Sequence, residues 1–213
     1  MKQSLVFIVA LAMLVTTGTA HACIIPSDGM GVHEENIVLC KGSYNLTHGI
    51  YLYSNSSFIS SLDCNGSILT GSGNYNGITI SKKGGIVKNC IISNYEKGID
   101  TGGEQDDYAR DIYIFNNTLY KNNYGIYLGA FLKDSVIKNN TLYNNSYNNQ
   151  PTGIYSSHHM ENVIIVNNTI YDGFFTQYTG EVDFCLNNSQ NNYINGVGPN
   201  CSCLLYTSPS PRD

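Results

Sequence analysis

Charged residues are scarce in this sequence, and basic ones are the scarcest. Asp, Glu, Lys and Arg together make up 13% of the 213 residues, about half the usual share, and the formal net charge at pH 7 is −5. No block of Lys or Arg exists, and Arg110 is the only arginine ahead of residue 203. We therefore do not expect the chain to bind nucleic acid through its phosphates. Hydrophobic residues, at 42%, alternate regularly enough to bury a core, which argues against disorder.

Long apolar segments are missing beyond the N-terminus. An apolar run extends from Leu5 to Val15, and Ala20-His21-Ala22 has the small-x-small form of a cleavage site. Eleven apolar residues are too few to span a bilayer as a helix, so we interpret residues 1–22 as a secretory signal peptide. A lipoprotein anchor on Cys23 is the competing interpretation, but Ala20 stands where a lipobox usually has Leu. No membrane span is expected in the mature chain.

The last eleven residues, 203–213, differ abruptly from the Asn-rich and β-branched sequence before them. They resemble a translated adaptor from a sequencing library, and we exclude them from the fold. The expected domain is residues 23–202, with further coils or a cap expected beyond it in the natural chain. Without Cys203 an even number of mature cysteines remains, as is typical of disulfides in an exported protein. They are Cys23, Cys40, Cys64, Cys90, Cys185 and Cys201.

Helical periodicity is absent after the signal peptide, and a repeat takes its place. A Gly-Ile pair returns at intervals of 28, 21, 27 and 28 residues. The pairs are Gly49-Ile50, Gly77-Ile78, Gly98-Ile99, Gly125-Ile126 and Gly153-Ile154. A second cassette, Asn-Asn-Thr, returns out of step with them at Asn116, Asn139 and Asn167. A period in this range indicates a supersecondary unit that buries its apolar face only by stacking on its neighbours.

The residues around each Gly-Ile pair alternate in character. Ile50 and Leu52 are expected to point one way, and Tyr51 and Tyr53 the other. Short alternating runs rich in Ile, Val and Tyr, bounded by Gly and Asn, are half-buried strands. Two or three such strands per period describe one rung of a parallel β-helix, in which each strand pairs with its equivalent in the next rung. The sequence therefore predicts an all-β fold of about six rungs.

Asparagine is the residue expected at the corners, because it tolerates the left-handed backbone conformation. We expect one corner to carry a stacked amide ladder made of Asn89, Asn116, Asn139 and Asn167. Glycosylation is the alternative, since the last three of these begin Asn-x-Thr sequons. The better glycan candidates are sequons in expected loops, at Asn45, Asn55 and Asn144.

These residues resemble a known family. The sequence from Leu62-Asp63-Cys64-Asn65-Gly66 through Asn116-Asn117-Thr118 to Gly153-Ile154-Tyr155 is similar to right-handed parallel β-helix repeats, whose architecture pectate lyases share. It is similar in particular to Asn-rich repeats of secreted and cell-surface proteins, and to the periplasmic copper-binding β-helix family of nitrous oxide reductase maturation. The resemblance implies a single-stranded right-handed parallel β-helix. It implies little about activity, because the repeat consists of core and corner residues.

Cysteines fall near the expected corners. Cys64 and Cys90 occupy corresponding positions one rung apart, and the rung spacing is within the Cα separation that a disulfide accepts. We predict the pairs Cys64–Cys90, Cys23–Cys40 and Cys185–Cys201. A metal site made of cysteines is disfavoured, because none of them forms a Cys-x-x-Cys pair.

Tyrosines are expected in outward-facing columns. The residue after each anchoring apolar residue gives one column, made of Tyr51, Thr79, Asp100, Tyr127, Tyr155 and, after Val182, Asp183. A second column contains Tyr120, Tyr143 and Tyr171. Rings that carry a hydroxyl suit sugars, so Tyr51, Tyr127 and Tyr155 are candidate substrate-binding residues. The alternative is that these tyrosines only stabilise the sheet by cross-strand stacking.

An acidic loop is the most enzyme-like feature. Asp106 and Asp107 lie between Asp100 and Arg110, and all four are candidate catalytic residues. The resemblance implies the chemistry of related lyases, in which carboxylates hold Ca²⁺ against the substrate and an Arg or Lys takes the proton. Asp106 and Asp107 are the candidate Ca²⁺ ligands. The loop matches no lyase motif residue by residue, and the alternative, a solvated insertion between two rungs, needs no special explanation.

Two adjacent histidines raise the question of copper. His158-His159 precedes Met160 in an expected turn, and imidazoles with a thioether can attract copper. Adjacent residues of a strand point to opposite faces, however, so we do not expect copper to be a cofactor.

Three hypotheses about function remain open. The first is a secreted or cell-surface β-helix that binds a polysaccharide or cell-surface glycan, or serves as a structural or adhesive module, without catalysis. The second is a Ca²⁺-dependent polysaccharide lyase or related enzyme. The third is a periplasmic copper-binding module. No Ser/His/Asp or Cys/His signature of a nucleophilic enzyme is present.

Overall fold

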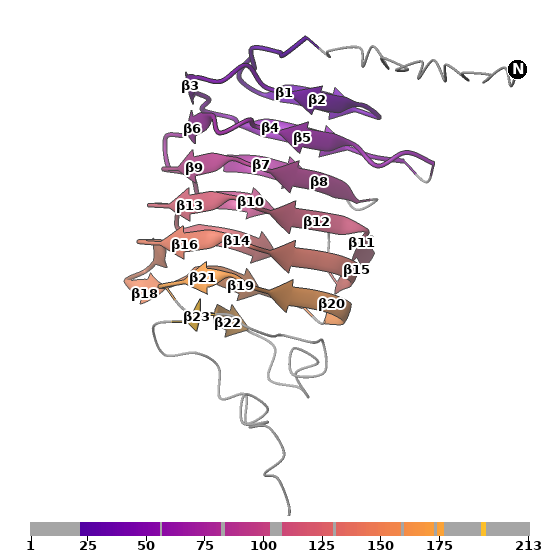
Figure 1. The fold of residues 1–213 in the computed structure, drawn as a ribbon. Coiled ribbons are helices and arrows are strands. Elements are labelled where there is room, and N and C mark those ends of the chain that lie inside the picture. Colours follow the sequence, from indigo (N-terminus) through magenta and orange to yellow (C-terminus); the bar gives the residue numbers. More distant parts are fainter. Residues whose placement is uncertain are drawn as a thin grey trace, which may run out of the picture.

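The chain winds into a stack of flat rungs. The computed structural model describes residues 22–55, 57–81, 84–102, 108–129, 131–158, 160–172, 174–176 and 193–194. Within these ranges every regular element is a β-strand. The described residues include no long apolar helix of the kind that crosses a bilayer. Three parallel sheets run the length of the stack (Figure 1). The predicted all-β parallel β-helix is confirmed.

Each rung contributes a strand to each sheet, and the fourth rung contributes two short strands to sheet 2. Sheet 1 contains β1 (Met30–His33), β4 (Ile50–Tyr53), β7 (Asn76–Ile80), β10 (Lys97–Asp100), β14 (Tyr124–Leu128), β19 (Ile154–Ser156) and β22 (Phe174–Thr176). Sheet 2 contains β2 (Asn36–Val38), β5 (Ser61–Asp63), β8 (Gly85–Lys88), β12 (Ile112–Phe115), β15 (Phe131–Lys138), β20 (Met160–Val166) and β11 (Tyr108–Arg110), which pairs with β15. Sheet 3 contains β3 (Ser43–Asn45), β6 (Ile68–Thr70), β9 (Ile91–Ser93), β13 (Thr118–Tyr120), β16 (Thr141–Tyr143), β21 (Thr169–Ile170) and β23 (Tyr193–Ile194).

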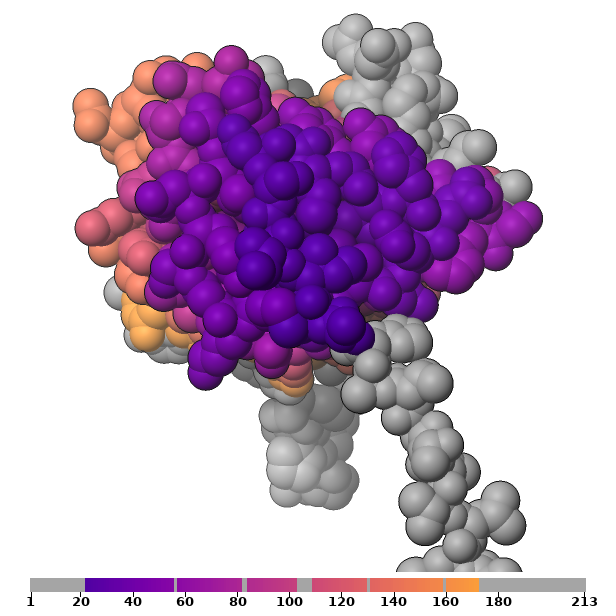
Figure 2. All heavy atoms as spheres, turned by 90° about the horizontal axis from the view of Figure 1, so that it is seen from above, coloured from indigo at the N-terminus to yellow at the C-terminus, as the bar shows by residue number. Residues whose placement is uncertain are grey.

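The described strands make about six rungs, as predicted. The first rung is β1, β2 and β3, and the sixth is β19, β20 and β21, with β22 and β23 paired onto it. A short antiparallel hairpin, β17 (Ser146–Tyr147) and β18 (Gln150–Pro151), projects from the fifth rung. Seen from above, the first rungs overlie the later ones along one axis (Figure 2).

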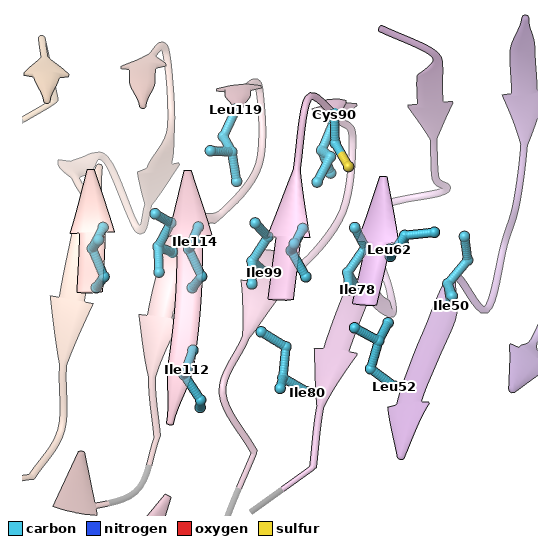
Figure 3. Packing of buried hydrophobic residues seen from close by; sticks show 14 of the residues in the cluster. Ile50, Leu52, Leu62, Ile78, Ile80, Cys90, Ile99, Ile112, Ile114 and Leu119 are labelled. Carbon is cyan, nitrogen blue, oxygen red and sulfur yellow. The ribbon is translucent and has the colours of Figure 1, made fainter. Parts of the chain in front are cut away.

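The Gly-Ile pairs stack on one another in sheet 1. Ile50, Ile78, Ile99, Ile126 and Ile154 are Cα partners in successive rungs. All five side chains are buried. Figure 3 shows Ile50, Ile78 and Ile99 pointing inward, toward aliphatic side chains of the other two sheets. Burying aliphatic side chains this fully stabilises a fold by about 1.5–3 kcal/mol for each one. The stack therefore buries its apolar face between rungs as well as across the interior.

Close approach of backbones explains the glycine of each pair. A Cβ added to Gly98 would lie 2.6 Å from the carbonyl oxygen of Gly125 and 2.8 Å from Cδ2 of Leu119. A Cβ on Gly77 would likewise lie 2.6 Å from the carbonyl oxygen of Gly98. Each glycine thus makes room for the next rung, and this need repeats with the period of the fold.

The amide ladder exists at the predicted corner, but it is made of other asparagines than we predicted. Asn89, Asn116, Asn139 and Asn167 do adopt the left-handed conformation, with φ between 55° and 58°, but they line the outside of the corner between sheets 2 and 3. The ladder is formed by the residues that follow three of them, Asn117, Asn140 and Asn168, each 1% exposed. The left-handed residue redirects the chain, so the residue after it points inward.

The inner amides bond along the stack. Asn117 Nδ2 donates to Oδ1 of Asn140 at 3.0 Å, and Asn140 Nδ2 donates to Oδ1 of Asn168 at 3.0 Å. Each amide also donates to a backbone carbonyl, as Asn117 does to Val87 at 3.1 Å. The ladder therefore satisfies buried backbone groups as well as its own side chains.

A second ladder, which the sequence interpretation missed, lies at the corner between sheets 3 and 1. Asn122 Nδ2 donates to Oδ1 of Asn145 at 3.1 Å, and Asn145 Nδ2 donates to Oδ2 of Asp172 at 2.8 Å. Asn122 Oδ1 in turn accepts the backbone N–H of Tyr95 at 3.0 Å. The signal was present: Asn122 and Asn145 each come four residues after Thr118 and Thr141, the threonines that close the Asn-Asn-Thr cassettes.

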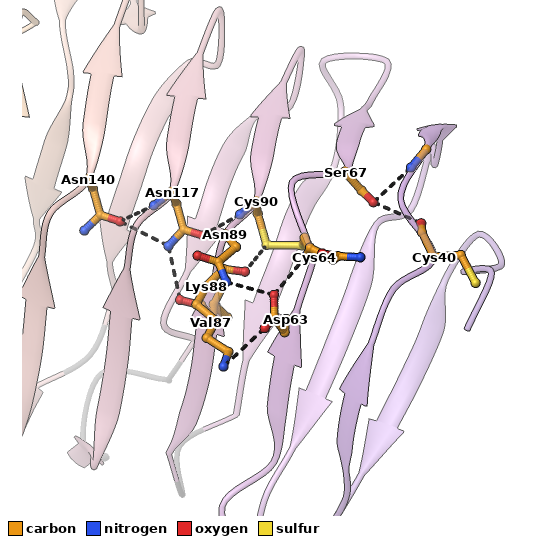
Figure 4. The surroundings of a disulfide bond; sticks show 12 residues. Cys40, Asp63, Cys64, Ser67, Val87, Lys88, Asn89, Cys90, Asn117 and Asn140 are labelled. Atoms are coloured by element: carbon orange, nitrogen blue, oxygen red, sulfur yellow. Dashed lines mark hydrogen bonds and ion pairs between the residues drawn. A yellow bond between two sulfur atoms is a disulfide. The ribbon is translucent and has the colours of Figure 1, made fainter. Parts of the chain in front are cut away.

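Two of the three predicted disulfides are confirmed. Cys23–Cys40 and Cys64–Cys90 both have S–S distances of 2.04 Å, with Cα–Cα distances of 4.7 and 4.8 Å. The second links adjacent rungs at the same corner as the first amide ladder (Figure 4). The remaining predicted pair, Cys185 with Cys201, lies outside the described residues. Structural disulfides indicate that the chain folds in an oxidising compartment.

Candidate functional site

The outward column of sheet 1 has the predicted register. Tyr51, Thr79, Asp100, Tyr127 and Tyr155 are Cα partners in successive rungs. The next position belongs to Phe175. Asp183, which was expected to end the column, lies outside the described residues.

Four tyrosines gather at the later rungs of this column, and we call Tyr124, Tyr127, Tyr147 and Tyr155 the tyrosine cluster. The rings of Tyr127 and Tyr155 stack with centroids 5.1 Å apart and an interplanar angle of 13°. Tyr124 stacks on Tyr147 at 4.9 Å and 26° and also contacts Tyr127 and Tyr155, each at 5.1 Å. Offset or tilted pairs at these separations are the favoured aromatic geometries.

Only half of this cluster follows from the column. Tyr124 comes from the position before Gly125, where Asn76 and Lys97 precede the glycines of the two earlier rungs. This position recurs regularly in the sequence and defines another column on sheet 1, distinct from the tyrosine column of sheet 3. Tyr147 comes from the projecting hairpin, and it is 43% exposed. Its contact with Tyr124 had no periodic signal.

Two tyrosines of the cluster, Tyr124 and Tyr155, have raised pKa values. Burial raises the pKa of Tyr124 above its ordinary value, and the neighbouring hydroxyls of the cluster raise it further. Burial also raises the pKa of Tyr155, as does Tyr127 beside it. Neutral phenols both donate and accept hydrogen bonds, so the cluster offers flat apolar rings with hydrogen-bonding edges.

A polar network adjoins the cluster on its N-terminal side. Lys97 Nζ lies 4.1 Å from the centroid of the Tyr127 ring and 3.3 Å from Oδ2 of Asp100. The same carboxylate oxygen accepts a hydrogen bond from Asn76 Nδ2 at 2.8 Å, and Oδ1 accepts the backbone N–H of Gly102 at 3.1 Å. Asp100 is only 7% exposed. Its charge is therefore held by an ordered set of donors.

Tyr51 stands apart from the tyrosine cluster. Three rungs, about 14 Å by strand spacing, separate it from Tyr127. Its own neighbour is Tyr53, with ring centroids 6.3 Å apart, and Tyr53 stacks on His33 at 4.5 Å and 9°. The outer face of sheet 1 thus carries aromatic surface at both ends, with Thr79 and Asp100 between them.

The second predicted tyrosine column lies on sheet 3. Tyr120 and Tyr143 are Cα partners, and their rings stack at 5.2 Å and 6°. Tyr171 follows β21 on the next rung, and it is 48% exposed. This column is a different face of the stack, and Lys97 and Asp100 do not belong to it.

The candidate catalytic residues lie on two different sheets where they are described. Asp100 ends β10 of sheet 1, whereas Arg110 ends β11 on sheet 2, beside Lys133 of β15. The cation that pairs with Asp100 is Lys97. Asp106 and Asp107 lie outside the described residues, so their predicted roles stay predictions.

The predicted metal ligands are described only in part. Ser157 Oγ lies 2.9 Å from Nδ1 of His158, and the His158 ring lies 5.7 Å from that of Phe131. His159 lies outside the described residues. Across the described ranges no group of three or more His, Cys, Asp or Glu side chains is arranged to hold a metal ion. The Ca²⁺ and copper sites therefore have no support from the described residues.

A shallow hollow lies at the other side of the stack, at the corner between sheets 2 and 3. Its volume is about 380 Å³. It is lined by Asn65, Gly66, Asn89, Cys90, Ile91, Asn116 and Thr118. None of these side chains titrates near neutral pH, because Cys90 is in a disulfide. The hollow therefore supplies no acid or base.

Comparison with known proteins identifies the architecture. A family model described as a right handed beta helix region matches residues 30–208. No curated protein and no solved structure matches the chain.

Proposed function

We propose that this chain, which belongs to the right-handed β-helix family, binds a glycan without catalysis on the outer face of sheet 1. The observation that carries the proposal is the tyrosine cluster. Tyr127 and Tyr155 present nearly parallel rings in successive rungs, and a sugar ring stacks on such a surface through its C–H groups. The hydroxyl edges then bond to sugar hydroxyls.

The neighbouring polar groups support binding more than catalysis. A general base or nucleophile has to reach its substrate. Asp100 is only 7% exposed, and its carboxylate accepts hydrogen bonds from Asn76, Lys97 and the Gly102 N–H. Lys97 is held between that carboxylate and the Tyr127 ring. Such a network positions the rings around it.

Export is the second part of the proposal. One disulfide ties the segment before β1 to the first rung, a second joins the second and third rungs, and the sequence begins with a signal-peptide pattern. A glycan-binding protein of this kind would act outside the cell or at its surface.

Binding is tested with purified chain and a panel of soluble polysaccharides, by affinity electrophoresis and calorimetry. Tyr127→Ala and Tyr155→Ala should each weaken binding roughly tenfold, since each removes a stacked ring. Tyr120→Ala and Tyr143→Ala are the matched controls, because they remove a similar stacked pair from sheet 3. Equal losses in both pairs, or no binding by the wild-type chain, would refute the proposal.

Lyase activity is measured on the same panel. Cleavage by elimination creates an unsaturated uronate that absorbs ultraviolet light, so product is followed directly with and without Ca²⁺. We expect no increase in absorbance. A Ca²⁺-dependent increase that Asp100→Ala abolishes would replace binding with catalysis as the function of this face.

A further inference from the structure

We infer that the glycan bound by the tyrosine cluster is a neutral polysaccharide and not a uronate-containing one. This inference rests on the proposed function and names the substrate class of the same site. It follows from how the charges on the outer face of sheet 1 are paired.

Charge is almost absent from the strands of this face. Lys97 and Asp100 are the only charged residues in β4, β7, β10, β14 and β19, all of which the structure describes in full. They pair with each other, so the strands carry no net charge. An acidic sugar would therefore meet no uncompensated cation on these strands.

The positive charge of Lys97 is already compensated by the carboxylate of Asp100. Its Nζ sits 3.3 Å from Asp100 Oδ2 and 4.1 Å from the centre of the Tyr127 ring. The side chain of Lys97 is 21% exposed and that of Asp100 is 9% exposed, so solvent screens the pair only weakly. A uronate that recruited Lys97 would have to leave Asp100 with less compensation. It would also bring a second carboxylate close to that of Asp100, and like charges at short range repel.

A further carboxylate lies near the site. Glu96 precedes Lys97 and is among the groups that raise the pKa of Tyr124. Lys121, the basic residue closest to Tyr124 in sequence, is exposed at the corner between sheets 3 and 1.

What the face does offer suits neutral sugars. The uncharged polar groups of this face include the amide of Asn76, the hydroxyl of Thr79 and the hydroxyls of the tyrosine cluster. Each can donate and accept, as sugar hydroxyls do. Selectivity against acidic sugars then comes from the carboxylates, through repulsion, while the rings supply the attraction.

The test compares neutral and uronate polymers of similar length on the wild-type chain, at low and high salt. We expect neutral polymers to bind with an affinity that changes by less than about twofold between the two, because no ion pair forms. Uronate polymers should bind at least tenfold more weakly or not at all. Salt-sensitive binding of the uronate polymer by the wild type, with or without Ca²⁺, would overturn the inference.

Asp100→Asn tests the cause. It keeps the shape of the side chain and the acceptor for the Gly102 N–H, but it frees the charge of Lys97. We expect the variant to gain roughly threefold or more in affinity for the uronate polymer at low salt, and to lose that gain at high salt. An unchanged preference in a variant that still binds the neutral polymer would overturn the mechanism.

The outcomes separate this inference from the proposed function. If neither polymer class binds, or if Tyr127→Ala binds as the wild type does, the proposed function fails. If uronate polymers bind through Tyr127 and Tyr155, glycan binding stands and only the neutral class is wrong. The wild-type measurements decide this even if Asp100→Asn does not fold.

Discussion

The backbone N–H of Cys90 donates a hydrogen bond to Oδ1 of Asn117 at 3.0 Å. This bond joins the buried disulfide to the amide ladder, so that one continuous column runs from Cys64 to Asn168 along the corner between sheets 2 and 3. Figure 4 shows the part of this column from Cys64 to Asn140. Where an amide would otherwise continue the column toward the N-terminus, a covalent bond holds the second and third rungs together. The disulfide and the amide ladder both fix the register of successive rungs.

Removal of one inner amide should destabilise the fold strongly. Asn117→Ala takes this hydrogen-bond partner away from the Cys90 N–H and from the Val87 carbonyl, both in a buried place. We expect the free energy of unfolding to fall by about 2–4 kcal/mol, measured by urea denaturation. Asn116→Gly is the control, since Asn116 is exposed and glycine adopts its positive φ readily. A control variant as unstable as Asn117→Ala would show that the outer corner, and not the ladder, carries the stability.

The different positions of Asn116 and Asn117 show what a sequence repeat can and cannot predict. The Asn-Asn-Thr cassette predicted a corner, a left-handed residue and a ladder, and all three exist. Which asparagine points inward depends on how the backbone turns at the corner, and a period alone does not contain that information. The same limit explains why the ladder through Asn122 and Asn145 was missed although its spacing was regular.

The glycines of the Gly-Ile pairs should tolerate no side chain. In Gly98→Ala the new Cβ meets the carbonyl oxygen of Gly125, which is backbone and cannot rotate away. We expect a loss of about 1–3 kcal/mol, measured by urea denaturation. Gly66→Ala is the comparison, because its Cβ meets nothing within 4 Å and only the positive φ of 75° opposes it. If Gly66→Ala proved the more damaging change, rung spacing would not be the reason for the repeat.

The sequence predicted which residues of the candidate site align in successive rungs, but it did not predict all the residues that meet there. The alternation around each Gly-Ile pair placed Tyr127 and Tyr155 on one outward column, and their stacking follows from that register. The contribution of Tyr147 depends on a hairpin inserted between rungs, and the pairing of Lys97 with Asp100 depends on side-chain geometry. Neither is a consequence of periodicity.

The two disulfides should differ in their resistance to reduction. Cys64 and Cys90 are 0% and 1% exposed, whereas Cys23 is exposed and Cys40 is half-buried. A thiolate has to reach the sulfur that it attacks, so a mild reductant should open Cys23–Cys40 first. Alkylation followed by mass spectrometry gives the order. Simultaneous loss of both bonds in the folded chain would mean that the second and third rungs open together with the first.

Replacing the buried disulfide should be costly. Cys64–Cys90 closes a loop with a sequence separation of 26. The chain-entropy estimate for a loop of this size is about 3.5 kcal/mol. Cys64→Ala with Cys90→Ala should lose about that much, measured by urea denaturation, whereas Cys23→Ala with Cys40→Ala should leave the later rungs folded. Equal collapse of both variants would contradict this division.

Alkaline pH should destabilise the fold through the tyrosine cluster. Burial and neighbouring hydroxyls raise the pKa of Tyr124 above its ordinary value near 10. Between that value and the raised pKa, the unfolded chain has released this proton and the folded chain still holds it. The free energy of unfolding therefore falls as pH rises above about 10, by at most about 1.4 kcal/mol per pH unit for this group. Tyr124→Phe has no proton to release, so its stability should fall less steeply than that of the wild type between about pH 10 and 11.5, as followed by urea denaturation. Parallel curves for the two proteins over that interval would show that Tyr124 ionises as readily in the folded chain as in the unfolded one.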